Sequence, residues 1–515
     1  MSNIAAIDIG TNSLHLMVAE VLDDGSFRVL TREKEPVRLG SGGGDMKRLD
    51  DDAITRGVDA LRRFAAIASQ FDAPIHAYAT SAVREARNRD DFVGRVRNEV
   101  GVRVEVISGP EEARLIHLGV RQAVAVGDAT HLVVDIGGGS TEFVVAGPDG
   151  TDLLRSMKLG AIRLTDRFFP DGVHTEFGEA ACRAHIRSAL TPMVDRIVEL
   201  DPTLWIASSG TAETLAVAAG DPERLPAEAL HELTPRLLAT KPEKRRSFEG
   251  IDERRQDIIA GGVVLLDEIT RLCGVQEWTI SPLALRAGIV SDLIDRESPR
   301  DDNHHLDELR RSSALAVARR YHEDLGHAEH VTDLALELFD ELEPLHRQPA
   351  AARDLLEAAG LLHNIGVFVA HSAHHKHSQY LIRHDEQLAG FTDRERDVVS
   401  LVARYHRKSA PKQKHLEFAA LDPDDQEVVR HLAAVLRIAI GLDRSGRRHV
   451  RRIVSANVDD HSIAIEVEVP PDVSPQMELH SARARSTMAE QLYGRAVTID
   501  AVISTSSHPV FRSSD

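Results

Sequence analysis

Two short turns in the sequence combine carboxylates with small residues of the kind that bind phosphate. One reads LVVDIGGGSTEFVV, in which Asp135 and Glu142 flank the segment from Gly137 to Thr141. Glycines let a ligand approach the backbone closely, and consecutive free N–H groups form a cradle for phosphate. The flanking acids would repel phosphate unless a divalent cation such as Mg²⁺ lay between them. A hairpin turn that is rich in glycine by chance is the alternative.

The same pattern occurs at the N-terminus, which makes a chance turn harder to accept. IAAIDIGTNSLHLMVAEV places Asp8 before a small polar turn, Thr11-Asn12-Ser13, and between two apolar runs of strand length. Asp8 and Asp135 are separated by about one domain length. We therefore predict two similar lobes, each of which presents a phosphate loop to a shared cleft.

Three further segments carry residues suited to phosphate chemistry. Glu111 and Glu112 open a predicted helix in SGPEEARL, where a carboxylate could deprotonate an attacking water or simply complement the helix dipole. Arg84 in TSAVREA could bind a phosphate oxygen or form a surface ion pair. SSGT, at positions 208–211, lies between a predicted strand and helix, and a helix N-terminus binds anions.

The elements that position these residues follow an α/β pattern. Strands and helices alternate over residues 1–126 and again over 127–300, which predicts two α/β lobes. The composition changes near residues 298–302, which we interpret as a linker. Apolar residues then recur at three- and four-residue spacing over 305–445, which predicts an all-α domain, and residues 446–515 read as a small α+β domain.

Composition limits the classes of partner. The 515-residue chain has a net charge of −19, which argues against a nucleic-acid partner. It has two cysteines, no signal-peptide pattern and no apolar run of membrane-spanning length. We therefore expect a cytoplasmic protein without a membrane partner, and we expect a homodimer.

Two basic segments interrupt this acidic chain. RYHRKSAPKQKH and RSGRRHVRR each carry five Lys or Arg and no acid. Such segments suggest a track for a polyanion, although solvated surface charge is an equal alternative. The residues that we assign to this predicted track are Lys408, Lys412, Lys414, Arg447 and Arg448.

Taken together, the motifs resemble one enzyme family. AAIDIGTNSLHLMVAEV, ATSAVREARN, ISGPEEARLI, LVVDIGGGSTEFVV and ASSGT, in this order and spacing, are similar to the exopolyphosphatase / guanosine pentaphosphate phosphatase (Ppx/GppA) family. The resemblance covers nearly the whole chain. It implies duplicated lobes of the actin-like (RNase H-like) superfamily. It also implies removal of a terminal phosphate with Mg²⁺ and a glutamate-activated water.

The resemblance also implies roles for single residues. Glu112 matches the catalytic base, and Asp135, Glu142 and Asp8 match the acids of the metal and phosphate site. The residues that fall on phosphate-binding loops are Thr11, Asn12, Ser13, Arg84, Gly137, Gly138, Gly139, Ser140, Thr141, Ser209, Gly210 and Thr211. One departure is SPLALRAGIV, where Leu283 and Ala287 replace the family's usual Gly and Glu while Arg286 and Gly288 remain.

The predicted helical domain resembles the HD-type domain of long family members. Its candidate metal ligands are His330, His363 with Asn364, and Asp443. Asn364 stands where an Asp is needed, and a neutral amide is a poorer ligand for a hard cation. We therefore expect this domain to guide substrate and to lack hydrolase activity of its own. The HSAHHKHSQYLIRH segment has the composition of metal ligands, but the resemblance favours a polar wall.

The leading functional hypothesis is an exopolyphosphatase, because a long polyanion needs contacts remote from the chemistry and the basic segments could supply them. The alternative is guanosine pentaphosphate 5′-phosphatase, which would use the same catalytic residues. A polyphosphate:ADP phosphotransferase and a (p)ppGpp-binding regulator are weaker alternatives, the latter because a sensor needs no base beside its phosphate loop.

Overall fold

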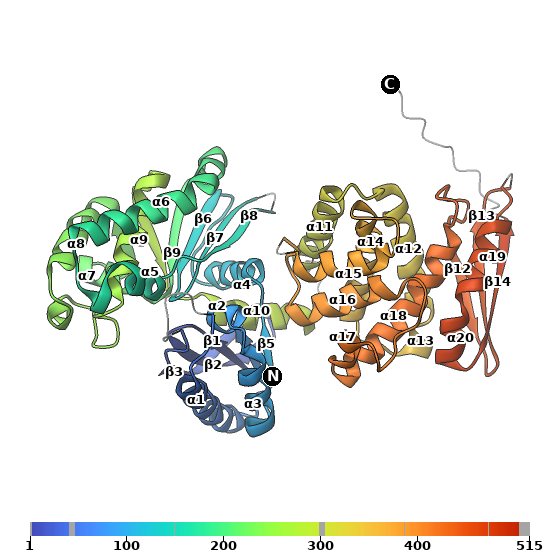
Figure 1. The fold of residues 1–515 in the computed structure, drawn as a ribbon, viewed down its shortest axis with the longest axis horizontal. Helices are drawn as coiled ribbons and strands as arrows, with labels where there is room; N and C mark the ends of the chain where they lie inside the picture. The colour runs from blue at the N-terminus through green and yellow to red at the C-terminus, as the bar shows by residue number, and fades with distance from the viewer. Residues whose placement is uncertain are drawn as a thin grey trace. The chain divides into compact units, whose positions relative to one another are not determined.

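The computed structural model describes residues 3–40, 47–148, 150–297, 304–385, 387–471 and 473–503. The predicted linker at 298–302 lies outside the described residues. The chain forms two compact units, residues 1–305 and 306–515, and each is described by itself (Figure 1). Within the described ranges, no helix is long and apolar enough to cross a membrane.

The first lobe is built on a five-stranded sheet in the order β3-β2-β1-β4-β5. β2 pairs antiparallel with β1 and β3, whereas β4 runs parallel to β1 and β5. The apolar side chains of one face pack under α1, whose N-terminus is capped by the Asp50 carboxylate. The strands are β1 (Asn3–Ile9), β2 (Ser13–Val21), β3 (Phe27–Pro36), β4 (Ile75–Ala79) and β5 (Val104–Val106), and the helices are α1 (Asp51–Ser69), α2 (Ser81–Glu85) and α3 (Arg89–Val100).

The second lobe repeats this topology. Its sheet has the order β10-β11-β9-β6-β7-β8, in which β8-β7-β6-β9-β11 corresponds to β3-β2-β1-β4-β5 of the first lobe. The strands are β6 (His131–Ile136), β7 (Thr141–Gly147), β8 (Gly150–Met157), β9 (Leu204–Ser208), β10 (Arg224–Pro226) and β11 (Glu277–Ser281). The helices are α5 (Ala161–Phe168), α6 (Glu176–Glu199), α7 (Ser209–Ala219), α8 (Ala227–Ala239) and α9 (Ile259–Cys273), with 3-10 turns at Pro170–Gly172 and Pro242–Ser247.

The two phosphate turns have the same backbone geometry. The Gly10 N–H donates to the Ser13 carbonyl at 3.2 Å, and the Gly137 N–H donates to the Ser140 carbonyl at 3.0 Å. Each turn joins two antiparallel strands, as the hairpin interpretation predicted. The duplication that the sequence indicated is therefore confirmed at the level of topology and of the turns.

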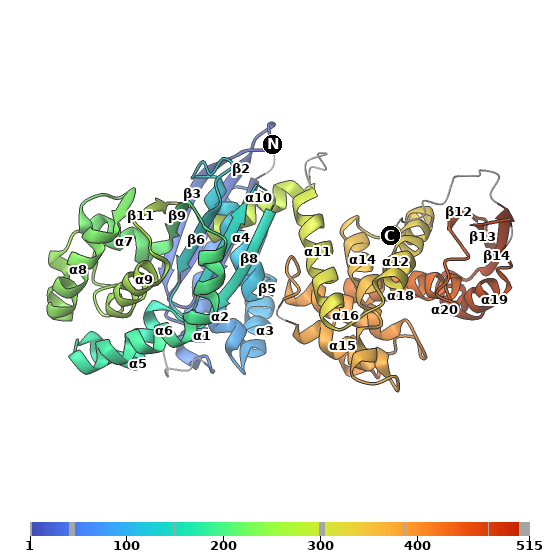
Figure 2. The same cartoon turned by 90° about the horizontal axis from the view of Figure 1, so that it is seen from above.

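Two helices connect the lobes more closely than the predicted boundary at 126/127 suggests. α4 (Gly109–Arg121), placed by sequence in the first lobe, packs on β7 and β8 of the second. α10 (Leu285–Glu297), placed in the second lobe, packs on β1 and β2 of the first. The two helices also pack against each other, so one apolar core runs between both sheets (Figures 1 and 2).

Residues 306–515 form a helical region followed by a three-stranded sheet in the order β12-β13-β14. A single hydrophobic core runs through both, so the predicted boundary at 445/446 divides one compact unit and not two domains. The helices are α11 (His304–Arg320), α12 (Leu325–Glu341), α13 (Glu343–His346), α14 (Ala351–Leu362), α15 (His374–His384), α16 (Asp393–Tyr405), α17 (Leu416–Ala419) and α18 (Pro423–Leu442), with a 3-10 turn at Ile365–Phe368. β12 (Arg452–Val458), β13 (Ser462–Val469), α19 (Gln476–Arg485), α20 (Thr487–Tyr493) and β14 (Ala496–Ile503) follow.

Candidate active site

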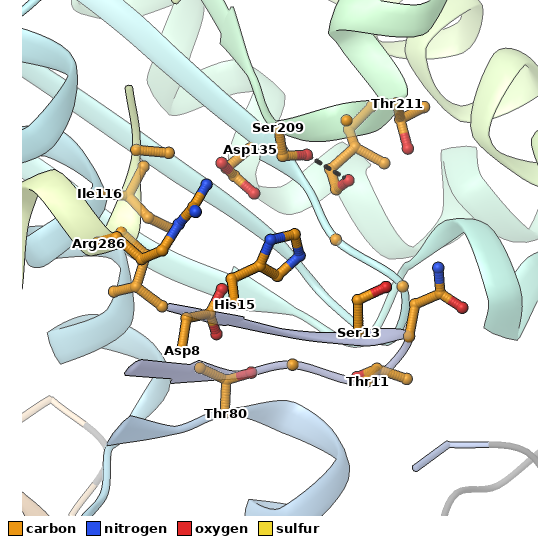
Figure 3. A pocket seen from close by; sticks show the side chains of 18 of the residues that line it. Asp8, Thr11, Ser13, His15, Thr80, Ile116, Asp135, Ser209, Thr211 and Arg286 are labelled. Carbon is orange, nitrogen blue, oxygen red and sulfur yellow. Dashed lines mark hydrogen bonds between the residues drawn. The ribbon is translucent and has the colours of Figure 1, made fainter. Parts of the chain in front are cut away.

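A cavity of about 400 Å³ lies between the two lobes and is lined by both phosphate turns. Figure 3 shows Asp8, Thr11 and Ser13 from the first lobe opposite Asp135 and Ser209 from the second. Most of the predicted site residues line it: Asp8, Thr11, Asn12, Ser13, Glu112, Asp135, Gly137, Gly138, Ser140, Ser209, Gly210 and Thr211. Arg84, Gly139, Thr141 and Glu142 do not line the cavity and lie behind these residues.

Two polar atoms of the first turn could bind a ligand. Asn12 Oδ1 and Ser13 Oγ are buried and have no hydrogen-bond partner in the described part of the chain. Thr11 Oγ1 lies 2.8 Å from Ser81 Oγ and is satisfied. A buried polar atom without a partner is costly, so an oxygen-rich ligand at this turn would stabilise the cleft.

Carboxylates in the cavity are held in a water-poor setting. Burial raises the pKa of both Asp8 and Asp135 to about 7; Glu112 adds to both shifts, and Asp135 adds to the shift of Asp8. Burial likewise raises the pKa of Glu142 well above its usual range, with Glu112 and Asp135 adding to the shift. Such a group of acids ionises readily only beside a cation.

The donor set fits a hard divalent cation. Ser208 Oγ donates to Asp135 Oδ2 at 2.6 Å, which orients the carboxylate. No three His, Cys, Asp or Glu side chains in the described ranges converge on one metal position. Mg²⁺ commonly binds through one or two carboxylates together with phosphate oxygens, and Asp8 and Asp135 are the two cavity carboxylates that could serve.

The two adjacent glutamates of α4 have different surroundings. Glu111 is 1% exposed and receives two hydrogen bonds from Arg114, at 2.7 and 2.8 Å, and Arg114 also contacts Asp292 at 2.7 Å. Glu112 lines the cavity instead. Burial raises the pKa of the Glu112 carboxyl, and Arg84 opposes this shift. The choice of Glu112 over Glu111 therefore agrees with the geometry.

Positive side chains also line the cavity, and the sequence analysis named only Arg286 among them. Arg32 and Lys34 come from β3, Arg255 from the loop before α9, and Arg286 from α10. Burial lowers the pKa of Lys34, and Arg255 lowers it further. Arg32, Lys34 and Arg255 could not be predicted from the sequence, because they belong to no motif and cations on strands and loops are common on protein surfaces.

His15 was also missed, although the duplication offered a signal. Asp8 pairs with His15 across the first hairpin, in the register in which Asp135 pairs with Glu142 across the second. His15 lines the cavity, where burial, followed by Arg286, lowers its imidazole pKa to about 2. The departures from the family pattern, Leu283 and Ala287, line the same cavity.

The predicted polyphosphate track is exposed in the second unit. Lys408, Lys412, Lys414 and Arg447 are solvent-exposed. Arg448 is also exposed, but its Nη2 donates to the Gly326 carbonyl at 2.6 Å. The first four side chains are therefore better placed to bind an anion than Arg448, and the track itself stays a prediction.

The predicted HD-type ligands take part in other contacts. His327, which the sequence analysis did not select, donates from Nδ1 to Asp443 Oδ2 at 2.7 Å. His330 Nε2 contacts the Val450 carbonyl at 2.8 Å. The Asp443 hydrogen bond raises the pKa of His327, and this carboxylate therefore already has a protein partner.

Two other predicted features of this region also have protein partners. The Asn364 side chain hydrogen-bonds the Glu323 carboxyl, and Asn364 follows the buried His363. In the HSAHHKHSQYLIRH segment, His374 Nε2 lies 3.3 Å from His406 Nε2. Both side chains therefore have polar protein partners, and the polar wall that the resemblance favoured stays a prediction.

Two lobes with matching phosphate turns, acids and a buried glutamate at one cleft define a phosphoanhydride hydrolase of the actin-like type. Residues 17–297 match the Ppx/GppA phosphatase family, and residues 309–482 match domain III of these phosphatases. The chain therefore belongs to the Ppx/GppA phosphatase family.

Relatives along most of the chain bear one name. The guanosine-5′-triphosphate,3′-diphosphate pyrophosphatase of Aeromonas hydrophila is 31% identical over 441 residues, which cover 85% of this chain and 86% of that protein. The protein of the same name from Aeromonas salmonicida is 30% identical over the same length.

Solved structures match a shorter part. A crystal structure of an exopolyphosphatase from Cytophaga hutchinsonii is 30% identical, with a TM-score of 0.54, and the match covers 57% of this chain and 98% of that one. An Aquifex aeolicus member of the Ppx/GppA family is 25% identical, with a TM-score of 0.50 over 58% of this chain and 99% of that one.

Proposed function

We propose that this enzyme removes the 5′-terminal phosphate of guanosine pentaphosphate, which yields guanosine tetraphosphate and inorganic phosphate. The observation that carries the choice of substrate is the name shared by relatives that match 85% of the chain. The neighbouring structure named as an exopolyphosphatase matches only 57%. Of the two substrates that the sequence suggested, the comparisons favour the alternative over the leading hypothesis.

The proposed chemistry follows from the residues of the cavity. The turns at Thr11–Ser13 and Gly137–Ser140 would hold the terminal phosphate through N–H and hydroxyl donors. Glu112 would accept a proton from a water as its oxygen attacks the terminal phosphorus and the bond to the bridging oxygen breaks. Asp135 and Asp8, with Glu142 behind them, would hold Mg²⁺, which neutralises charge on the phosphate oxygens. Arg32, Lys34, Arg255 and Arg286 supply positive charge for the remaining phosphates.

A second substrate, inorganic polyphosphate, is supported by a separate observation. Lys408, Lys412, Lys414 and Arg447 are exposed in an otherwise acidic chain. A guanosine nucleotide does not need such a remote set of cations, whereas a long polyanion can use them. We therefore include exopolyphosphatase activity as the second candidate.

The remaining predictions complete the proposal. We expect a cytoplasmic homodimer that acts with Mg²⁺, in which the second unit guides substrate and has no hydrolase activity of its own. A phosphotransferase would need ADP in place of water, and a pure regulator would not need Glu112 beside the phosphate turns.

One experiment separates these functions. Phosphate release is measured with Mg²⁺ from guanosine pentaphosphate and from long polyphosphate, and ADP is added to polyphosphate to test for ATP. We expect a higher kcat/KM for guanosine pentaphosphate, slower release from polyphosphate and no ATP. A higher kcat/KM for polyphosphate would reverse the order of the candidates, ATP formation would support the phosphotransferase, and no release would leave only the regulator.

A further inference from the structure

Arg84 lies beside the catalytic region but is committed to protein partners. It sits on α2, directly after β4. Its Nη1 donates to the Ile107 carbonyl at 2.9 Å and to Glu112 Oε2 at 2.8 Å. This one nitrogen therefore links Ile107, which follows β5, to Glu112 in the first turn of α4.

The surroundings of Arg84 are already rich in anions. Glu112, Glu142 and Glu85 all stabilise its positive charge. The Arg84 side chain is 18% exposed and the Glu112 side chain 8%, and only Glu112 lines the cavity. Nη1 is occupied by its contacts with Ile107 and Glu112, and no atom of Arg84 lines the cavity in which a substrate phosphate would bind. Other cations line the cavity directly.

The contact with Arg84 fixes the orientation of the Glu112 carboxylate at the cavity. The guanidinium holds Oε2, which orients the carboxylate that would accept the proton of the water. Thr80 also donates to the Glu112 carboxyl from the end of β4. The other charged groups around it, Asp8, Asp135 and Glu142, are acids and repel its charge. Arg84 is therefore the cation in direct hydrogen-bond contact with Glu112.

We propose that Arg84 is a positioning residue for Glu112 and not a phosphate ligand. This corrects the expectation that Arg84 belongs to the phosphate-binding loops. The inference rests on the proposed function, because it assigns Arg84 to the base of the same reaction. It requires that loss of Arg84 slows turnover and leaves substrate binding almost unchanged.

The test compares R84M and R84K with wild type and with R87M. Arg87 is an exposed arginine in the same segment and lies outside the cavity, so R87M controls for loss of an arginine. Phosphate release from guanosine pentaphosphate is measured at saturating Mg²⁺, and circular dichroism checks folding. We expect R84M to lower kcat by roughly 10²-fold, the usual result of a misplaced catalytic group. We expect a KM within about twofold of wild type. R84K keeps the charge and should recover part of kcat.

A double-mutant cycle with E112Q gives an independent readout. If Arg84 acts through Glu112, R84M/E112Q should be no slower than E112Q alone, because the positioned group is already lost. A KM raised many-fold at unchanged kcat, or a further loss in the double variant, would overturn the proposal. If R84M does not fold, R84K and R84K/E112Q carry the same comparison. Inactive wild-type protein would instead refute the proposed function.

Discussion

Replacing Gly288 by alanine should destabilise residues 1–305 and slow hydrolysis, because Gly288 sets the distance between α4 and α10. A Cβ on Gly288 would lie 1.7 Å from the Leu115 carbonyl oxygen and 2.6 Å from its carbon. Gly119 makes the reciprocal contact, and its Cβ would lie 2.0 Å from the Ala284 carbonyl oxygen. Backbone atoms cannot rotate away as a side chain can, so the helices must separate by roughly 1 Å.

The clash should lower both the stability of the unit and the rate of hydrolysis. Overpacking typically costs about 1–3 kcal/mol, and a backbone clash of this severity belongs at the upper end. For a unit of this size that corresponds to a fall in Tm of up to about 5 °C. Glu112 lies in the first turn of α4 and Arg286 in that of α10. A shift of about 1 Å between them should lower kcat by roughly 10²-fold.

Calorimetry and phosphate release on the full chain measure both effects, with G94A as the matched control. Gly94 lies in α3, and a Cβ there would meet no atom within 4 Å. Alanine is the better helix former, so G94A should stabilise by up to about 1 kcal/mol and leave activity unchanged. A G288A protein with the Tm and kcat of wild type would refute the idea that this crossing sets the geometry of the site.

Three more predictions concern the charges. D135N should raise the Mg²⁺ concentration for half-maximal activity by about 10-fold or more. D152N, which removes an exposed carboxylate, should leave this concentration unchanged. Equal shifts in the two variants would argue against a metal role for Asp135. The pKa values of Asp8 and Asp135 are raised to about 7 from an ordinary 3.8, so stability without Mg²⁺ should fall as pH rises through this window. Mg²⁺ should then raise Tm more at pH 8 than at pH 5, and the same gain at both pH values would contradict this reasoning. Neutralising the four exposed cations Lys408, Lys412, Lys414 and Arg447 should weaken the binding of long polyphosphate and reduce the dependence of its affinity on salt. If the affinities of wild type and variant fell equally steeply with salt, the four residues would be ordinary surface charges.

The sequence predicted best what local residue types determine. The turns after Asp8 and Asp135 combine small residues with flanking strands, and their duplication predicted two lobes and a shared cleft. The exchange of α4 and α10 between the lobes could not be predicted in this way, because the amphipathic face of a helix does not say which sheet it will cover. The contact of Arg84 with Glu112 could not be predicted either, because the separation of two residues in the chain does not show that their side chains lie 2.8 Å apart in the fold.

The difference between the two turns would allow one cleft to hold both the proposed metal and a polyanion. The second turn pairs Asp135 with Glu142, whereas the first pairs Asp8 with His15 at the equivalent register. A carboxylate in place of His15 would add another buried negative charge near Asp8. The imidazole stays neutral, since burial and the charge of Arg286 oppose its protonation. Arg286 and Lys34 line the cavity beside His15, whereas the equivalent position of the second hairpin holds the buried carboxyl of Glu142. A phosphoanhydride substrate with its cation would use both kinds of surroundings, and sequence divergence between two copies of one turn would supply them.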